Sequence, residues 1–268
     1  MGRIIAIANQ KGGVGKTTTA INLAASLALS DEEILLIDSD PQGNATSGLS
    51  ATSGLNAANG PDRGSIKSLY GVYSGAVGAE DAIIPTEVSH LSLIPSSVDL
   101  LGVEIELIEK EGREGLLKEM LSSIKDRFRY IFIDCPPSLG LLTLNALVAA
   151  DSVLVPVQCE YYALEGVGML SRTLDLVRGA FNPSLALEGV LLTMYDSRNT
   201  LSSQVAEELK KHFGLKVYNT VIPRNVTLAE APSHGKPVLL YDARSRGAQS
   251  YLSLAKEILY EAGARQRA

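Results

Sequence analysis

A glycine-rich segment near the N-terminus, KGGVGKTT at residues 11–18, has the composition of a phosphate-binding loop. Its residues are Lys11, Gly12, Gly13, Val14, Gly15, Lys16, Thr17 and Thr18. Glycines let the backbone curl so that several N–H groups converge on phosphate oxygens, and a helix that follows adds its positive dipole end. Lys16 would neutralise the β- and γ-phosphates of a nucleotide, and the Thr17 hydroxyl would bind Mg²⁺. The order of strand, glycines, Lys-Thr pair and helix favours this interpretation over a glycine-rich turn without a ligand.

Carboxylates follow two of the apolar runs. Asp38 and Asp40 come directly after residues 34–37, and Asp134 follows residues 130–133. A carboxylate at the carboxyl end of a parallel strand points into the ligand crevice, so Asp134 would lie near Mg²⁺. Because residues two apart share one side of an extended backbone, one of Asp38 and Asp40 could hold a metal-bound water while the other holds the attacking water. Taken alone, each pattern also fits a turn or a buried strand that ends in an acid.

Short apolar runs alternate with helical patterns, which predicts an α/β fold with a doubly wound, mostly parallel sheet and helices on both faces. The runs cover residues 4–8, 34–37, 91–94, 130–133, 153–157, 187–194 and 217–222. The helical patterns include residues 17–29, 115–125, 141–149, 167–178, 202–212 and 248–261. We expect residues 47–64 and 71–81 to form a loop and a short helix between the second and third strands. No linker divides the chain, so we expect one P-loop domain over residues 1–268.

The composition excludes several classes of function. The chain has 268 residues with no Trp and 5% aromatic residues, which argues against a base-stacking platform for single-stranded nucleic acid. Its two cysteines, Cys135 and Cys159, and its three well-separated histidines argue against a Cys-rich or His-based metal centre. No apolar run has the length of a membrane span and no signal-peptide pattern begins the chain, so we expect a cytoplasmic protein.

Charge is unevenly distributed along the chain. The formal net charge is −6, yet residues 188–268 contain 11 Lys and Arg against 8 Asp and Glu, a net charge of +3. Bulk charge therefore argues against nucleic-acid binding by the chain as a whole, but a local basic face in the C-terminal third stays possible.

The phosphate-binding loop departs from the general pattern G-x-x-x-x-G-K-[ST]. Gln10 stands where that pattern has its first glycine, and Lys11 opens the loop instead. This is the deviant Walker A motif, K-G-G-x-G-K-[ST], and with it the sequence resembles the ParA/MinD superfamily of P-loop ATPases. The resemblance covers nearly the whole chain and is strongest for chromosomal ParA proteins of the Soj type. Its further motifs are D-x-D-P-Q-G-N-A-T at 38–46, D-x-P-P-S at 134–138, P-V-Q-x-E-Y-Y-A-L-E-G at 156–166, and residues 192–196, 221–225 and 230–237.

The resemblance implies an ATPase with ATP and Mg²⁺ as cofactors. In the family the first lysine of the loop reaches across a face-to-face dimer to the nucleotide of the other subunit, so Lys11 would couple ATP binding to formation of a homodimer. The resemblance also implies that Asp40 orients or activates the hydrolytic water and that Asp38 supports Mg²⁺ through water. Pro223 and Asn225 fall where the family holds the adenine, since an apolar wall and an amide match a base face and its polar edge.

ParA proteins also bind double-stranded DNA without sequence preference when ATP-bound. The resemblance implies this cycle for the chain, with release by a ParB-type centromere-binding protein that stimulates hydrolysis, and a nucleoid-associated location. The selected candidate DNA contacts are Arg198, Arg224, Lys236, Arg244 and Arg246, with Lys210, Lys211 and Lys216 as further cations of the same third. Arg198 matches a family DNA-binding arginine, whereas Thr227 stands where the family has a second one, which reduces the predicted patch.

Two alternatives remain open. A MinD-like membrane-associated positioning ATPase would carry an amphipathic membrane helix at its C-terminus. Residues 248–268 do contain an apolar stripe, formed by Tyr251, Leu254, Ala255, Ile258 and Leu259. The basic residues lie mostly at 265–267 rather than along a polar face, which favours packing on the domain and no membrane partner. A metabolic P-loop enzyme that phosphorylates a small molecule would need a polar substrate pocket, and the sequence shows no cluster for one.

Overall fold

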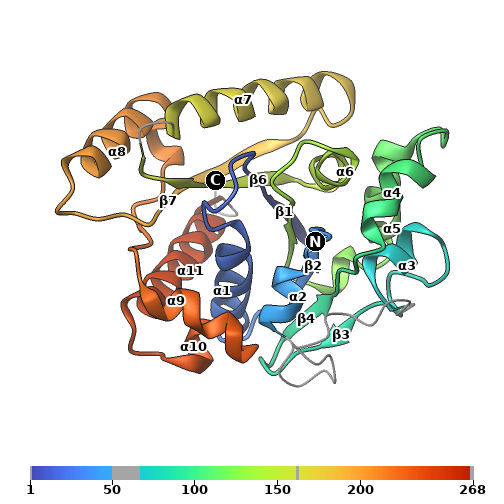
Figure 1. Cartoon of the computed structure of the whole chain (residues 1–268), viewed down its shortest axis with the longest axis horizontal. Helices are drawn as coiled ribbons and strands as arrows, with labels where there is room; N and C mark the ends of the chain where they lie inside the picture. The colour runs from blue at the N-terminus through green and yellow to red at the C-terminus, as the bar shows by residue number, and fades with distance from the viewer. Residues whose placement is uncertain (1, 50–66, 161–162, 266–268) are drawn as a thin grey trace.

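The computed structural model describes residues 2–49, 67–160 and 163–265, and its centre is a seven-stranded sheet (Figure 1). The strands are β1 (Arg3–Ile7), β2 (Ile34–Asp38), β3 (Ile84–Pro85), β4 (Leu91–Ile94), β5 (Tyr130–Asp134), β6 (Ser152–Gln158) and β7 (Ala186–Thr193). They lie in the order β3-β4-β2-β5-β1-β6-β7, and every pairing is parallel except that of the short β3 with β4. This order confirms the predicted doubly wound, mostly parallel sheet.

Helices cover both faces of the sheet (Figure 1). On one face α1 (Lys16–Ala28) packs against α11 (Arg246–Arg265), and on the other α5 (Leu116–Ser122) packs against α6 (Leu141–Ala149). The other α-helices are α2 (Asn44–Gly48), α3 (Leu69–Tyr73), α4 (Leu100–Glu106), α7 (Ala163–Ala180), α8 (Thr200–Phe213), α9 (Val226–Glu230) and α10 (Val238–Tyr241). Short 3-10 turns are η1 (Arg113–Gly115), η2 (Lys125–Arg127), η3 (Gly214–Lys216) and η4 (Ala231–His234).

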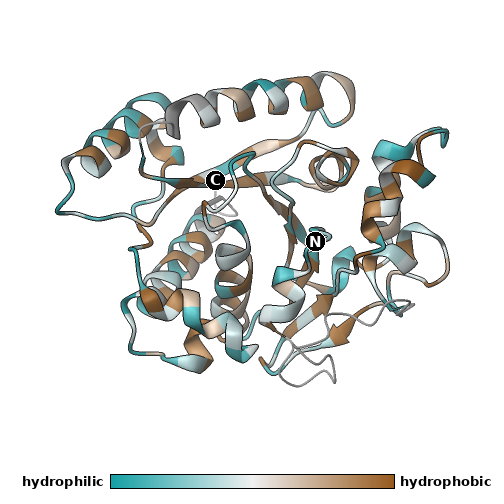
Figure 2. Cartoon of the chain, viewed as in Figure 1, coloured by the Kyte–Doolittle hydropathy of each residue, from teal (hydrophilic) through white to brown (hydrophobic). Residues whose placement is uncertain are grey.

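The central strands are apolar on both sides because both sides are covered. In β5, Ile131 and Ile133 belong to the core cluster that includes α5 and α6, whereas Tyr130 and Phe132 belong to the cluster that includes α1 and α11. Figure 2 shows the hydrophobic strands between helices whose outer surfaces are largely hydrophilic. Since both faces are closed by helices, a binding site is expected at the carboxyl ends of the strands.

The register of the three central strands sets the position of two acidic side chains. Ile7 of β1 lies beside Asp134 of β5, and Asp134 in turn lies beside Asp38 of β2. The chain that leaves β1 after Ile7 forms the glycine-rich loop at this same edge. The loop and both carboxylates therefore meet at one edge of the sheet.

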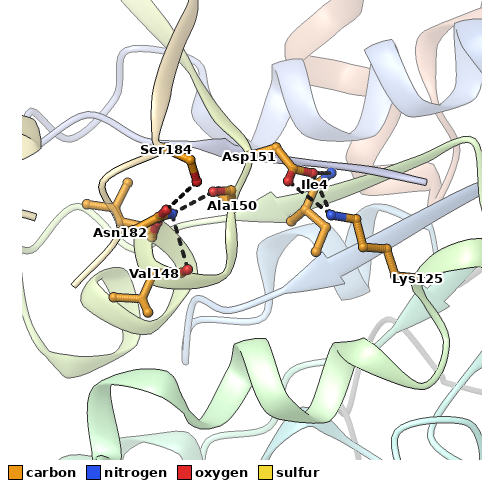
Figure 3. A network of polar contacts seen from close by, with 8 residues as sticks. Ile4, Lys125, Val148, Ala150, Asp151, Asn182 and Ser184 are labelled. Carbon is orange, nitrogen blue, oxygen red and sulfur yellow. Dashed lines mark hydrogen bonds and ion pairs between the residues drawn. The ribbon is translucent and has the colours of Figure 1, made fainter. Parts of the chain in front are cut away.

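Polar side chains fix the opposite edge (Figure 3). Asp151, between α6 and β6, accepts hydrogen bonds from the N–H of Ile4 (2.8 Å) and from the ammonium of Lys125 (2.9 and 3.0 Å). The amide of Asn182 donates to the carbonyl of Ala150 (2.8 Å). These contacts tie the amino ends of β1 and β6 to the connections around them, so the polar groups at this edge have structural partners.

The strand predicted over residues 217–222 is wrong. Isolated bridges pair Val217 with Val190 of β7, and Pro223, just past the segment, with Tyr195, just past β7. Between them, the N–H groups of Asn219 and Thr220 donate to the carboxylate of Glu257 in α11, at 2.7 and 2.9 Å. The N–H groups of Tyr218 and Ile222 still donate to carbonyls of β7 (3.0 and 2.8 Å). The ladder is interrupted between them because Glu257 accepts the N–H of Thr220, which a parallel pairing would direct to β7.

Two smaller differences lie between the second and third predicted strands. The short antiparallel strand β3 pairs with β4 through only two residue pairs, a length too short to leave an alternating pattern in the sequence. The expected short helix is present as α3. Most of the loop expected over residues 47–64 lies outside the described residues.

Candidate functional site

The glycine-rich loop adopts a conformation that depends on two of its glycines. Gly13 and Gly15 have φ angles of +74° and +90°, in the left-handed region that favours glycine. Gly15 directly precedes α1, and no side chain caps the first N–H groups of that helix. These N–H groups and the positive end of the helix dipole are therefore available to an anion. Gly12 differs because its φ lies outside the left-handed region, and a Cβ built there would meet no heavy atom of the described residues within 4 Å.

The two lysines of the loop have different surroundings. Lys16 is buried, and its ammonium donates to the carbonyl of Lys11 (3.2 Å). Burial lowers the pKa of Lys16, an effect that the carboxylates of Asp134 and Asp40 oppose. The ammonium of Lys11 is half-exposed and forms an ion pair with Glu160 (2.9 Å), just beyond β6. One lysine thus points into the site, and the other is held at the surface by its own chain.

Asn9 anchors the loop, and sequence reasoning missed it. Its side-chain oxygen accepts from the N–H of Lys11 (3.0 Å), and its side-chain nitrogen donates to the carbonyl of Pro156 in β6 (2.7 Å). On the other side, the Thr193 hydroxyl at the end of β7 donates to the carbonyl of Val14 (2.8 Å). The signal available for Asn9 was a single amide at the junction of strand and loop, which many turns share.

Asp134 is fully buried and lacks a hydrogen-bond partner for either carboxylate oxygen among the described residues. Burial raises its pKa well above the ordinary range, and the charges of Asp38 and Asp40 act in the same direction. The Thr17 hydroxyl and the Lys16 ammonium lower the pKa, but neither closes a hydrogen bond of normal geometry to this carboxylate. A buried carboxylate without a partner requires a cation or water, because leaving it unpaired is costly.

Asp38 is equally buried, but its carboxylate is fully engaged. One oxygen accepts from the N–H of Asp40 (3.2 Å), and the other accepts from both the N–H and the hydroxyl of Thr46 (2.7 Å each). Burial raises the pKa of Asp38, and the Thr46 hydrogen bonds limit that rise. The predicted role of Asp38 is a water-mediated one, and a carboxylate already bound by Thr46 is consistent with an indirect role.

Asp40 leaves one carboxylate oxygen available. Its Oδ1 accepts from the N–H of Gln42 (2.9 Å), and no hydrogen bond from the described residues reaches Oδ2. The side chain is 7% exposed, so a water in the site could approach it.

The residues present fit a magnesium nucleotide. The charges of Asp38 and Asp40 act on Asp134, and the ammonium of Lys16 acts on Asp40 and Asp134. Added positive charge would therefore offset the excess negative charge. In the part of the chain that the structure describes, no group of three or more His, Cys, Asp or Glu could hold a metal ion by itself. The hydroxyl of Thr17, the phosphate oxygens and water would therefore have to supply ligands beside Asp134.

A cavity of about 190 Å³ opens next to the loop and contains the two residues predicted to hold adenine. Pro223 and Asn225 line it together with Gly15, Thr193 and Tyr251. The side-chain oxygen of Asn225 is buried and has no partner among the described residues. An unpaired amide oxygen beside an apolar wall is what a base with an exocyclic amino group could satisfy.

Three of the predicted DNA contacts line a second, wider hollow of about 1110 Å³: Arg198, Arg224 and Arg246. All three are exposed. Arg244 is exposed and Lys236 is half-buried, and neither is among the residues that line this hollow. Sequence order alone could not separate the two groups.

Arg198 already has a partner. Its guanidinium donates to both carboxylate oxygens of Asp196, at 3.0 and 2.9 Å. These hydrogen bonds lower the pKa of Asp196 to about 2, so the carboxylate is charged at neutral pH. A phosphate that binds Arg198 must therefore compete with Asp196.

Known proteins share this sequence and fold. Residues 2–187 match the protein family described as AAA domain. The chain is 55% identical to the sporulation initiation inhibitor protein Soj of Bacillus subtilis, over 96% of this chain and 98% of that protein. It is 47% identical to the chromosome-partitioning ATPase Soj of Treponema pallidum, over 99% and 100%. A crystal structure of cobyrinic acid a,c-diamide synthase from Mycobacterium smegmatis with bound ATP analogue and magnesium matches with a TM-score of 0.81 and 39% identity, over 97% of this chain and 94% of that one.

A sheet of this order, with a two-lysine phosphate-binding loop after its first strand, defines a P-loop ATPase with a deviant Walker A motif. The chain belongs to the ParA/MinD superfamily, in the branch that contains the Soj and ParA chromosome-partitioning proteins.

Proposed function

We propose that this ATPase partitions chromosomes through a cycle of nucleotide-dependent DNA binding. In this cycle the chain binds ATP and Mg²⁺, forms a homodimer and binds double-stranded DNA without sequence preference. A ParB-type centromere-binding partner then stimulates hydrolysis and releases the protein. Its proposed location is the cytoplasm, in association with the nucleoid. The family membership supports the cycle, and the arrangement of the two hollows supports its DNA-binding step.

The nucleotide would occupy the edge of the sheet where the loop and the aspartates meet. Lys16 and the N–H groups of the loop would bind the phosphates, and Asn225 would bind the base. Thr17 and Asp134 would hold a bound Mg²⁺, which would supply positive charge to the phosphate oxygens. Asp40 would hold the attacking water through Oδ2 and orient it toward the terminal phosphate.

The observation that supports the DNA-binding step is that the small cavity beside the loop and the wide arginine-lined hollow share two lining residues. Pro223 and Arg224 line both the small cavity beside the loop and the wide arginine-lined hollow. A base held against Pro223 would therefore press on the segment that carries Arg224. Such a contact gives nucleotide binding a direct physical route to a candidate DNA-binding side chain.

DNA binding measured against salt tests this step. We expect binding with ATP but not with ADP or without nucleotide, and equal affinity for random and defined duplexes. Arg224→Ala should weaken binding and flatten the salt slope by about 1 per lost phosphate contact. Arg244→Ala, an exposed arginine outside the hollow, is the matched control and should change both less. Equal effects of the two substitutions, or strong preference for one sequence, would contradict the assignment of the hollow.

The membrane alternative is less well supported by the packing of α11. The apolar stripe is inside the domain, because Tyr251, Leu254 and Ile258 are each at most 1% exposed and belong to the core cluster that includes α1. Among the described residues, no helix combines the length and the apolar character that a membrane span requires. Sedimentation with anionic lipid vesicles and ATP tests the alternative on the intact chain, and co-sedimentation in the absence of DNA would favour it.

A further inference from the structure

The segment that carries Asp40 has no regular structure of its own. β2 ends at Asp38 and α2 begins at Asn44, so residues 39–43 depend on individual hydrogen bonds for their position. The carbonyl of Asp40 accepts from the N–H of Gly43 (2.9 Å), which closes a local turn. A local turn does not determine where Asp40 lies relative to the rest of the site.

Two contacts reach this segment from other strands. The N–H of Ser39 donates to the carbonyl of Asp134 in β5 (3.0 Å), and one contact reaches Asp40 itself. The hydroxyl of Ser96, two residues beyond β4, donates to the carbonyl of Asp40 at 2.6 Å. The N–H of Ser96 donates to the hydroxyl of Thr46 (2.9 Å), and that hydroxyl donates to Asp38 (2.7 Å). Ser96 and Thr46 are at most 1% exposed. Ser96 therefore links the backbone of Asp40 and the side chain of Asp38 in one buried chain of hydrogen bonds.

We propose that Ser96 is a positioning residue for ATP hydrolysis: its hydroxyl fixes the backbone of Asp40 so that the free carboxylate oxygen of Asp40 holds the attacking water in line with the terminal phosphate. The inference rests on the proposed role of Asp40. Among the described residues, Ser96 forms no hydrogen bond to the loop of residues 11–18 and does not line the small cavity, so its hydroxyl acts on hydrolysis and leaves nucleotide binding unchanged.

The neighbouring residue provides a matched control. Ser97 is 1% exposed, and its hydroxyl has no hydrogen-bond partner among the described residues. Ser96→Ala and Ser97→Ala thus remove the same atom from adjacent buried positions, and only the first removes a hydrogen bond to Asp40. Removal of an unpartnered hydroxyl does not disturb the segment, so Ser97→Ala reports the effect of the substitution itself.

Steady-state ATP hydrolysis by the full chain tests the proposal. Ser96→Ala should lower kcat by about 3- to 10-fold, the range expected for one buried hydrogen bond, with KM for ATP within about twofold of the wild type. Ser97→Ala should retain the wild-type kcat. Thermal unfolding and equilibrium ATP binding of both variants show whether each is folded and binds nucleotide.

Asp40→Ala completes the experiment. If it abolishes hydrolysis while Ser96→Ala matches Ser97→Ala in kcat, the inference about Ser96 is overturned and the role of Asp40 stands. If Asp40→Ala hydrolyses ATP at the wild-type rate, the proposed role of Asp40 is overturned and the inference with it. A Ser96→Ala variant that loses ATP affinity in proportion to its loss of kcat/KM would also overturn it, because the hydroxyl would then serve binding.

Discussion

The buried carboxylate of Asp134 has opposite effects on function and stability. It is placed where a cation would lie, yet without one this buried carboxyl has no hydrogen-bond partner among the described residues. Burial raises its pKa, so the native state binds a proton at this carboxyl more tightly than the unfolded chain does. The free energy of unfolding of the nucleotide-free protein should therefore fall as pH rises from about 4 through the raised pKa.

Asp134→Asn tests directly how much the buried carboxyl lowers the free energy of unfolding. We expect the substitution to raise the free energy of unfolding by about 1–3 kcal/mol at neutral pH, because the amide removes the buried charge. The gain should disappear below about pH 4, where the carboxyl is protonated in the unfolded chain as well as in the native state. Urea unfolding across this pH range measures the effect, and Asp126→Asn, at an exposed position, is the control. A variant that is less stable than the wild type at every pH would show that Asp134 has a structural partner in solution.

Residue-scale chemistry was the most predictable part of the site. The glycines, Lys16, Asp38, Asp40 and Asp134 lie at one edge of the sheet, as the motifs indicated, because each motif follows directly on a strand. Their catalytic roles stay predictions. Ser96 could not be found, because its contact with Asp40 spans 56 positions and depends on β4 lying next to β2. A serine after an apolar run does not indicate a role until the neighbouring strand in the sheet is known.

At the scale of elements, the strand that was wrongly predicted and the strand that was missed have a common cause. The segment at 217–222 has the composition of a strand, but Glu257 of α11 takes the N–H groups of Asn219 and Thr220. β3 is too short to leave a periodic signal. In both cases the outcome depends on tertiary contacts, whereas the long buried strands are determined by their own residues.

The packing of the 217–222 segment on β7 gives a prediction at this scale. A Cβ at Gly189 of β7 would lie 2.5 and 2.7 Å from ring atoms of Tyr218, so Gly189→Ala must displace that ring. We expect a loss of about 1–3 kcal/mol in the free energy of unfolding. Gly168→Ala in α7, where a Cβ meets nothing within 4 Å, should instead stabilise by about 0.5–1 kcal/mol as a helix-interior substitution. Chemical denaturation of both variants measures these changes in the free energy of unfolding. Similar losses of stability in Gly189→Ala and Gly168→Ala would contradict a specific clash with Tyr218.

At the scale of the whole molecule, a substitution at Gly12 distinguishes effects on the monomer from effects on the proposed dimer. A Cβ at Gly12 meets no heavy atom of the described residues within 4 Å, so Gly12→Val should leave folding and ATP binding intact. We expect it to prevent ATP-dependent dimerisation, because the added side chain would meet the second subunit.

Lys11→Ala should also bind ATP as a monomer, whereas Lys16→Ala should lose ATP binding itself. Light scattering and equilibrium ATP binding measure the two properties, and normal dimers of both Gly12→Val and Lys11→Ala would refute the face-to-face arrangement.

The ion pair of Arg198 with Asp196 gives a second prediction for the assembled molecule. Asp196→Asn keeps an acceptor for the N–H of Arg198 but releases the guanidinium from a carboxylate, so DNA affinity should rise. Arg198→Ala should lower it and flatten the salt slope by about 2 per dimer. Asp242→Asn removes the same charge beside Arg244, where only a backbone N–H is bound, and it is the control for net charge. If Asp242→Asn raises affinity as much as Asp196→Asn does, the competition between Asp196 and phosphate is refuted.

The contact between Lys11 and Glu160 has a consequence for how two subunits would separate. If Lys11 binds a phosphate of the other subunit, it loses its ion pair with Glu160 and gains one with the phosphate. The number of ion pairs that Lys11 forms therefore stays the same. Association would then depend less on ionic strength than the proposed DNA binding would, where each new contact would displace condensed counterions. Salt could detach the protein from DNA while leaving its subunits together. When the subunits separate after hydrolysis, Lys11 would leave the phosphate of the other subunit and pair again with Glu160. Its ammonium would therefore not be left without an anionic partner.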